Sequence, residues 1–319
     1  MRTLPKPRFP QLLKRIARTN LPTGSIFVLV LWYAGKPRLQ TAVTNSDVLH
    51  QLGEQEFVTG ERILNICDVA FFPREYVDEF PSVRLNAKAL VFVDEPFTYA
   101  SAALISRSRT FFLKPEFLKF FIREVDPLIR EEYVLFTHMS DETSGKYNKY
   151  QYKHIYKHIL RCLPRLLKWY GCNMSPTKKT EGIPLGLENV DMWKRTNYLQ
   201  LMRARHTKKK KLLYFYFNAR TNLKARGMAN KSLSINGFSQ QKRHDNWSAY
   251  IEELAQYKFC ASPQGNGVDT HRMWECLYLG VIPVVVRNPI LQRWFSGLPI
   301  LWIDSFQQVT PTYLESVEI

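Results

Sequence analysis

Several features that would assign a protein to a class at once are absent from this sequence. No apolar run approaches the roughly 20 residues that a membrane-spanning helix needs, since the run at residues 26–33 (IFVLVLWY) has eight. The basic first twenty residues lack the continuous apolar stretch of a signal peptide. We therefore expect a soluble, cytoplasmic protein, for which a peripheral membrane contact through its basic surface stays open.

Two patterns of metal and redox chemistry are also missing. No two of the five cysteines have Cys-x-x-Cys spacing, and no Asp-x-Asp occurs. The absence of Cys-x-x-Cys spacing argues against a zinc set. The odd number of cysteines, two of them inside apolar runs, predicts reduced and mostly buried thiols in a reducing compartment.

Acidic residues are scarce relative to basic ones. The chain has 28 Asp and Glu against 45 Lys and Arg, which gives a formal net charge of +17. This excess predicts an anionic partner, either a nucleic acid, an acidic membrane surface or a phosphorylated small molecule. A solvated basic surface that only keeps the protein soluble is the alternative.

Apolar runs of strand length recur along the chain and are mostly continuous, which is typical of strands covered on both faces. Helical patterns separate several of them, notably at residues 150–170 and 247–256, so we expect parallel α/β layers. The expected strands are residues 26–33, 66–72, 89–93, 133–137, 212–217, 258–261, 282–286 and 300–303.

The basic segment 203–211 (RARHTKKKK) marks the clearest boundary in the sequence, because a new apolar run follows it directly. We place a linker there. The predicted organisation is an N-terminal domain at 1–205, a C-terminal domain at 206–305, and a tail at 306–319 that packs back on the first domain.

Residues 258–286 (KFCASPQGNGVDTHRMWECLYLGVIPVVV) carry the strongest functional signal. A strand is followed by a turn with Gly265, Asn266 and Gly267, and then by a short helix that Asp269 or Thr270 can cap. Backbone N–H groups of such a turn, together with a helix N-terminus, can bind a phosphate group. The layout predicts a nucleotide site in an α/β domain.

Charged side chains on this helix suit the same ligand. His271 and Glu275 are four residues apart and share a face. Arg272 fits a diphosphate by charge and fork geometry, and Glu275 can accept hydrogen bonds from ribose hydroxyls. An ordinary surface helix with an ion pair is the alternative.

At these residues the chain resembles exostosin-like glycosyltransferases. The resemblance rests on a Pro-x-Gly-x-Gly turn at 263–267, Arg272, Trp274-Glu275 and the Gly-Val-Ile-Pro-Val run at 280–284. It extends back over 136–141 (FTHMSD), 169–173, 183–187 (IPLGL) and 217–222 (FNARTN), and covers roughly residues 130–305. Two positions depart from the family pattern: Asn266, where an acidic residue is frequent, and His271, where a small or basic residue often stands.

The resemblance implies the GT-B architecture, in which two Rossmann-like domains face each other across a cleft. It also implies a glycosyltransferase that uses a nucleotide-sugar, UDP-xylose being the first hypothesis, on a glycan or glycoprotein acceptor. Arg220 and Arg272 would hold the diphosphate and Glu275 the ribose, with Gly265, Asn266, Gly267, Asp269 and His271 completing the donor site. No cofactor is implied, because cationic side chains and a helix N-terminus can stabilise the leaving diphosphate without metal; Lys224 or Arg226 could assist.

An inverting transferase needs a base that removes the proton of the acceptor hydroxyl. We expect it from the N-terminal domain at a strand end, where a polar group faces the cleft. Asp141, after the strand YVLFT, is the first candidate; His138 on the same turn and Glu95 (with Asp94) after the strand ALVFV are the others.

Two other functions stay open. A fucosyltransferase-like GT-B enzyme would use a GDP-sugar. A non-enzymatic nucleic-acid or polyanion-binding protein would explain the charge and the basic, aromatic helix pattern at 146–169. The sequence shows no recognisable nucleic-acid-binding module, so a nucleic-acid partner is the less favoured prediction.

Overall fold

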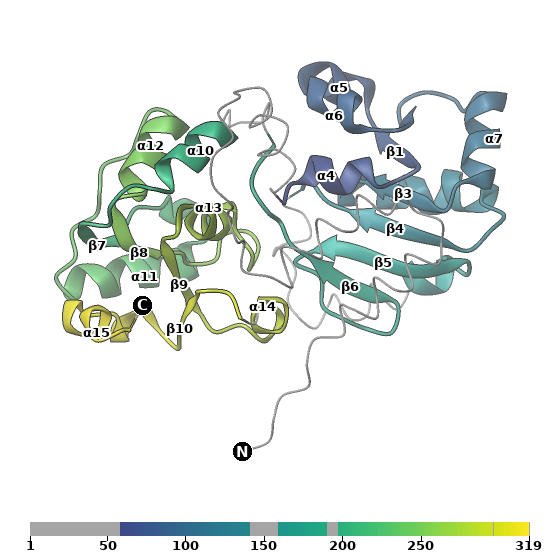
Figure 1. The fold of residues 1–319 in the computed structure, drawn as a ribbon. Coiled ribbons are helices and arrows are strands. Elements are labelled where there is room, and N and C mark those ends of the chain that lie inside the picture. Colours follow the sequence, from purple (N-terminus) through teal and green to yellow (C-terminus); the bar gives the residue numbers. More distant parts are fainter. Residues whose placement is uncertain (1–57, 141–158, 190–196, 296, 319) are drawn as a thin grey trace.

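A computed structural model describes residues 58–140, 159–189, 197–295 and 297–318. These residues form an α/β structure with two separate sheets, which occupy the two halves of the molecule in Figure 1. Every strand pairing within both sheets is parallel, so the parallel α/β prediction is confirmed. Among the described residues no helix is both long and apolar enough to cross a membrane.

The first sheet has six strands in the order β2-β1-β3-β4-β5-β6. The chain goes from β1 outward to β2 and then returns to the other side of β1 as β3. The order therefore reverses between β1 and β3, and such switch points are where open α/β sheets bind ligands. The strands are β1 (Val69–Phe72), β2 (Leu90–Phe92), β3 (Thr110–Leu113), β4 (Tyr133–Thr137), β5 (Leu166–Cys172) and β6 (Thr180–Ile183).

Helices cover both faces of this sheet, which explains its continuous apolar strands. Along β1, Val69 and Phe71 pack in one layer, whereas Ala70 and Phe72 pack in the other. The first layer contains α7 (Tyr99–Arg107), α8 (Leu118–Phe120) and the turns η2 (Phe121–Val125) and η3 (Asp126–Leu128). The second contains α4 (Gly60–Asn65), α5 (Arg74–Glu79) and α6 (Pro81–Asn86).

The second sheet has four strands in the order β10-β9-β8-β7 and is also covered on both faces. Its strands are β7 (Lys211–Tyr214), β8 (Tyr257–Ala261), β9 (Ile282–Val286) and β10 (Leu301–Ile303). One layer contains α10 (Tyr198–Ala204), α12 (Trp247–Leu254), α13 (His271–Leu279) and α14 (Pro289–Trp294). The other contains α11 (Leu223–Ile235), the turn η6 (Phe306–Gln308) and α15 (Pro311–Glu315).

Seven of the eight expected strands correspond to β1, β2, β4, β7, β8, β9 and β10, and the eighth, at 26–33, lies outside the described residues. The expected helix at 150–170 is wrong at its end, because residues 166–170 belong to β5. Pro164 cannot continue a helix, and the run after it buries Leu166 and Trp169 in the first sheet. Strands β3, β5 and β6 were not predicted.

Two expectations about the domains need correction. The tail does not pack on the six-stranded half, because Phe306, Val309 and Leu314 join the core beneath β7 and β8. Helix α10 precedes the predicted boundary at 205/206 but packs against α12 and α13 of the second sheet. The basic segment after it is therefore a loop within this half.

The packing of the tail predicts the effect of truncating a side chain. Leu314 is 1% exposed in the core of the four-stranded half, so Leu314→Ala should lower the free energy of unfolding by about 2–4 kcal/mol. Leu223, 72% exposed at the start of α11, is the control, and Leu223→Ala should change it by less than about 0.5 kcal/mol. Urea unfolding of both variants checks this; equal costs would contradict the packing.

Candidate functional site

The Gly-rich turn lies between β8 and α13, as the sequence predicted. It is closed by a backbone hydrogen bond of 3.0 Å from Gly265 N to Gly267 O. Of the two capping candidates, Thr270 is the residue that caps α13, since its side chain accepts from Met273 N. The N-terminus of α13 therefore begins directly after the turn, and its partial positive charge favours anions nearby.

Residues at the N-terminus of α11 hydrogen-bond to the other side of the Gly-rich turn. Asn222 caps α11 through Ala225 N, and its Nδ2 donates to Gly265 O at 2.9 Å. From the first turn of α11, Arg226 donates Nε–H to Gln264 O at 3.3 Å and Nη1–H to Asn218 O at 3.1 Å. The turn is thus held between the N-termini of two helices.

Gly265 leaves room for the side chain of Arg226. A Cβ atom at residue 265 would lie 2.8 Å from Arg226 Nη2, inside van der Waals contact. The guanidinium therefore lies across the turn, in the space that the missing side chain of Gly265 leaves open.

Arg272 brings a second guanidinium to the same place. It donates to Tyr216 O after the end of β7, and its Cζ atom lies 5.8 Å and 5.5 Å from the ring centroids of Tyr214 and Tyr250. Burial, and secondarily the charge of Arg272, lower the pKa of Arg226 to about 10. Both groups stay charged at neutral pH and repel each other, so an anion between them would relieve the repulsion.

The other predicted donor residues divide into two groups. Arg220 lies exposed in the turn η5 (Ala219–Thr221), just before α11, and Asn266 is exposed at the tip of the Gly-rich turn. Glu275, in contrast, is 2% exposed, and its oxygens accept from Trp247 Nε1 at 3.0 Å and Tyr250 Oη at 2.8 Å. In this structure Glu275 joins α13 to α12, and its ribose contact stays a prediction.

Asp269 and His271 contact the six-stranded half rather than the two arginines. Asp269 N donates to Asn173 Oδ1 and Leu185 N donates to Asp269 Oδ2, both at 2.8 Å. His271 Nδ1–H donates to Gly186 O, also at 2.8 Å. Asn173 and residues 185–186 follow the carboxyl ends of β5 and β6, so this edge of the first sheet meets the start of α13.

At Gly267 the backbone of the Gly-rich turn lies close to Asn173 at the edge of the first sheet. A Cβ atom there would lie 2.4 Å from Asn173 Nδ2. Asn173 has a φ of 56°, in the left-handed region, and its side-chain oxygen is held by Asp269 N. The two glycines of the turn therefore have different roles, because Gly265 admits Arg226 and Gly267 admits the first sheet.

Asp269 is buried in this contact. Besides Leu185 N, its carboxylate accepts Trp274 Nε1–H at 2.9 Å. Burial raises the pKa of Asp269 to about 7, although the hydrogen bonds to its carboxylate oppose the shift. Desolvation is thus the larger effect.

The predicted base residues occupy dissimilar places. His138, after β4, is 3% exposed; its Nδ1 accepts from Met139 N at 2.8 Å and its Nε2–H donates to Pro184 O at 3.2 Å. Burial lowers the pKa of His138 to about 4, so the ring is neutral. Glu95, after β2, is paired with Arg74, after β1, at 2.5 Å, and both side chains are exposed. Asp141 lies outside the described residues.

One cluster at the carboxyl edge of the first sheet escaped the sequence reasoning. Lys114 Nζ lies 4.3 Å from the ring centroid of Tyr76 and 3.6 Å from Glu116 Oε1, which accepts from Ser140 Oγ at 2.7 Å. These residues follow β1, β3 and β4, and therefore lie beside the switch point. Recognising the apolar run 110–113 as a strand would have revealed Glu116.

Within the described part of the chain, no group of three or more His, Cys, Asp or Glu side chains gathers as a metal site would require. Metal independence nevertheless stays a prediction. All five cysteines are free thiols, four of them buried and Cys162 exposed, which confirms the prediction of mostly buried thiols.

Neither models of known protein families nor curated protein sequences match this chain. The fold and the site define an α/β protein in which a cationic Gly-rich turn of the four-stranded half meets the carboxyl edge of the six-stranded parallel sheet. Its function is inferred below from that geometry.

The different roles of the two glycines predict different effects of the same substitution. Gly267→Ala should lower the free energy of unfolding by about 1–3 kcal/mol, because the Asn173 side chain that it meets is held in place. Gly265→Ala should cost less than about 0.5 kcal/mol. Its Cβ would meet Nη2 of Arg226, not the Nε and Nη1 atoms bonded to Gln264 O and Asn218 O, so a small shift of the guanidinium relieves the contact. Urea unfolding of the pair checks this. Equal costs would show that the two contacts are not distinct.

Titration of Asp269 and of His138 should change the free energy of unfolding with pH in opposite directions. The pKa of Asp269 is about 7 folded and about 3.9 unfolded, so the folded state holds more protons in this range and stability falls as pH rises. The pKa of His138 is about 4 folded and about 6.5 unfolded, so its contribution rises with pH. From pH 5 to 7 the two contributions, each about 2 kcal/mol, nearly cancel.

Single substitutions separate these contributions. Relative to wild type, Asp269→Asn should gain about 2 kcal/mol of unfolding free energy between pH 5 and 7, whereas His138→Gln should lose about the same amount. Urea unfolding as a function of pH provides the measurement. Parallel curves for wild type and both variants would mean that neither group titrates in this range.

Proposed function

We propose that the protein is a glycosyltransferase that binds a nucleotide-sugar at the Gly-rich turn, with a UDP-sugar as the donor class and UDP-xylose as the first donor to test. The observation that carries the proposal is the pair of guanidinium groups, Arg226 and Arg272, held beside the turn and between two helix N-termini. The exostosin-like pattern of residues 263–284 supports the same reading.

The two cations suit the charge that develops during glycosyl transfer. When the bond to the anomeric carbon breaks, the diphosphate leaves with additional negative charge. Positively charged groups that are already fixed in position stabilise such a leaving group most effectively. Arg272 is fixed by Tyr216 O, and Arg226 is fixed by Asn218 O and Gln264 O. Exposed Arg220 on the neighbouring turn adds a third cation that can close on the ligand.

The acceptor belongs, in this proposal, at the carboxyl edge of the first sheet, which gives a GT-B arrangement with the cleft between the sheets. Tyr76 offers an aromatic face on which a sugar ring can stack. Lys114 and Glu116 beside it can hydrogen-bond sugar hydroxyls. This edge also meets the start of α13 through Asn173 and Leu185.

A carboxylate at that edge supplies the base for an inverting reaction. The acceptor hydroxyl gives its proton to the carboxylate, its oxygen attacks the anomeric carbon, and the nucleoside diphosphate leaves with the bonding electrons. Asp141 remains the first candidate, and Glu116 joins it because it already bonds a hydroxyl, that of Ser140, at 2.7 Å. His138 fits the role less well because both ring nitrogens are engaged.

Nucleotide binding tests the proposal directly. Calorimetric titration with UDP, GDP, CMP and UDP-xylose should show one nucleotide class binding, with affinity unchanged by EDTA. Arg226→Ala should weaken that binding by about 10–100-fold, the loss expected for a hydrogen bond to a charged group. Lys231→Ala is the matched control, because Lys231 is an exposed cation on the same helix, α11.

Each outcome separates the alternatives. Binding of UDP and release of xylose from UDP-xylose would support the donor class, whereas preference for GDP would favour the fucosyltransferase-like reading. Absence of any nucleotide binding, together with tight and salt-sensitive RNA binding, would falsify the transferase proposal in favour of a polyanion-binding protein.

A further inference from the structure

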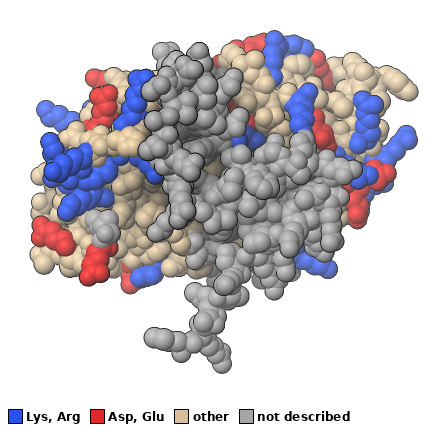
Figure 2. Space-filling model, in the orientation of Figure 1, with Lys and Arg blue, Asp and Glu red and all other residues tan. Residues whose placement is uncertain are grey.

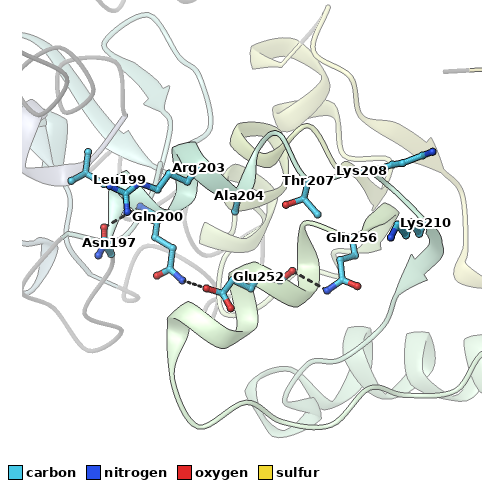
Figure 3. A pocket seen from close by; sticks show the side chains of 10 residues that line it. All are labelled: Asn197, Leu199, Gln200, Arg203, Ala204, Thr207, Lys208, Lys210, Glu252 and Gln256. Carbon is cyan, nitrogen blue, oxygen red and sulfur yellow. Dashed lines mark hydrogen bonds between the residues drawn. The ribbon is translucent and has the colours of Figure 1, made fainter. Parts of the chain in front are cut away.

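An open groove lies between α10 and α12, at residues that do not belong to the Gly-rich turn. Its volume is about 720 Å³, within the range of small-molecule sites. We call it the α10–α12 groove. Figure 3 shows Asn197 and Leu199 at one end and Lys208 and Lys210 at the other.

Lys209, between the two groove lysines in sequence, holds the backbone at this end of the groove in place. Lys209 Nζ donates to Ala255 O at 2.7 Å and to Leu279 O at 2.8 Å, next to the C-termini of α12 and α13. Lys210 N donates to Gln256 O at 2.8 Å. The backbone that carries Lys208 and Lys210 is therefore held in place before any ligand arrives.

The cations of the groove are available for a ligand. Arg203, Lys208 and Lys210 are exposed, and no ion pair joins them to any carboxylate of the described residues. Figure 2 shows Lys and Arg side chains gathered on the left flank of the molecule, beside the position of β7 in Figure 1. A phosphate group carries the charge that such a cluster attracts.

The middle of the groove is polar but contains an acid. Gln200, Thr207, Gln256 and Glu252 line it, and Glu252 Oε1 accepts from Gln200 Nε2 at 2.8 Å (Figure 3). A carboxylate repels a second phosphate but accepts hydrogen bonds from hydroxyl groups. None of the lining side chains is aromatic, so a base has no ring on which to stack.

We infer that the α10–α12 groove binds a phosphorylated sugar or polyol, with its phosphate at Lys208 and Lys210 and its hydroxyl groups along Gln256, Thr207 and Glu252. Cations at one end and hydroxyl-binding groups beside them match both halves of such a ligand. The site is separate from the nucleotide-sugar site proposed above, and it stands whether or not that proposal holds.

Calorimetric titration with glucose 6-phosphate tests the inference, with glucose and inorganic phosphate as the two half-ligands. Glucose 6-phosphate should bind at least about 10-fold more tightly than either half. The double variant Lys208→Ala/Lys210→Ala should weaken binding by about 10-fold or more, and Gln256→Ala by about 3–10-fold. Lys231→Ala, outside the groove, and Arg226→Ala, at the Gly-rich turn, should leave the affinity unchanged.

The same titrations can overturn the inference in three ways. Equal affinity for inorganic phosphate would remove the role of the hydroxyl-binding side chains. Loss of binding in Arg226→Ala but not in the double lysine variant would place the ligand at the Gly-rich turn. Tighter binding of a short single-stranded RNA, lost in the double variant, would replace the sugar phosphate by a nucleic acid. Thermal unfolding of each variant confirms that the fold is intact.

Discussion

The contact between the Gly-rich turn and the carboxyl edge of the first sheet is the constraint on which the rest of the site depends. It is made by backbone and buried polar groups, with Gly267 against Asn173 and the Asp269 carboxylate against Leu185 N. Because such groups cannot lose their partners without a large cost, the spacing of the two halves is fixed at this point. The start of α13 is thereby held to the first sheet, and Arg272 lies in its first turn.

The arginine pair is the physical basis of the anion site proposed here. Burial lowers the pKa of Arg226, and repulsion by the charge of Arg272 adds to the shift. Backbone carbonyls, not carboxylates, hold both groups. Their hydrogen bonds to carbonyl oxygens leave both guanidinium groups charged, and although Glu275 also attracts Arg272, this charge is the physical reason for proposing an anion site here.

The sequence predicted elements better than contacts. Strands with long apolar runs and the strand–turn–helix at 257–279 were predictable because burial on two faces and turn glycines leave local signatures. Strand β3 was missed although its apolar run TFFL is a local signature, whereas polar β6 was missed because its burial depends on neighbours far along the chain. Asp269 and Arg226 were named for the donor site, but their contacts could not be predicted, because their partners lie far along the chain. Nothing local shows that one carboxylate faces Leu185, or that one arginine crosses a glycine 39 residues away.

The net charge of +17 does not have a single cause. Lys209 neutralises the carbonyl ends of two helices, and Arg226 and Arg272 form the cation pair beside the Gly-rich turn. Lys208 and Lys210 flank Lys209 in sequence, yet they are exposed on a groove. Neighbouring positions in one basic run thus serve the fold and the surface separately. A total charge therefore indicates the sign of the partners, whereas only the placement of each cation indicates how many anionic ligands the protein can hold.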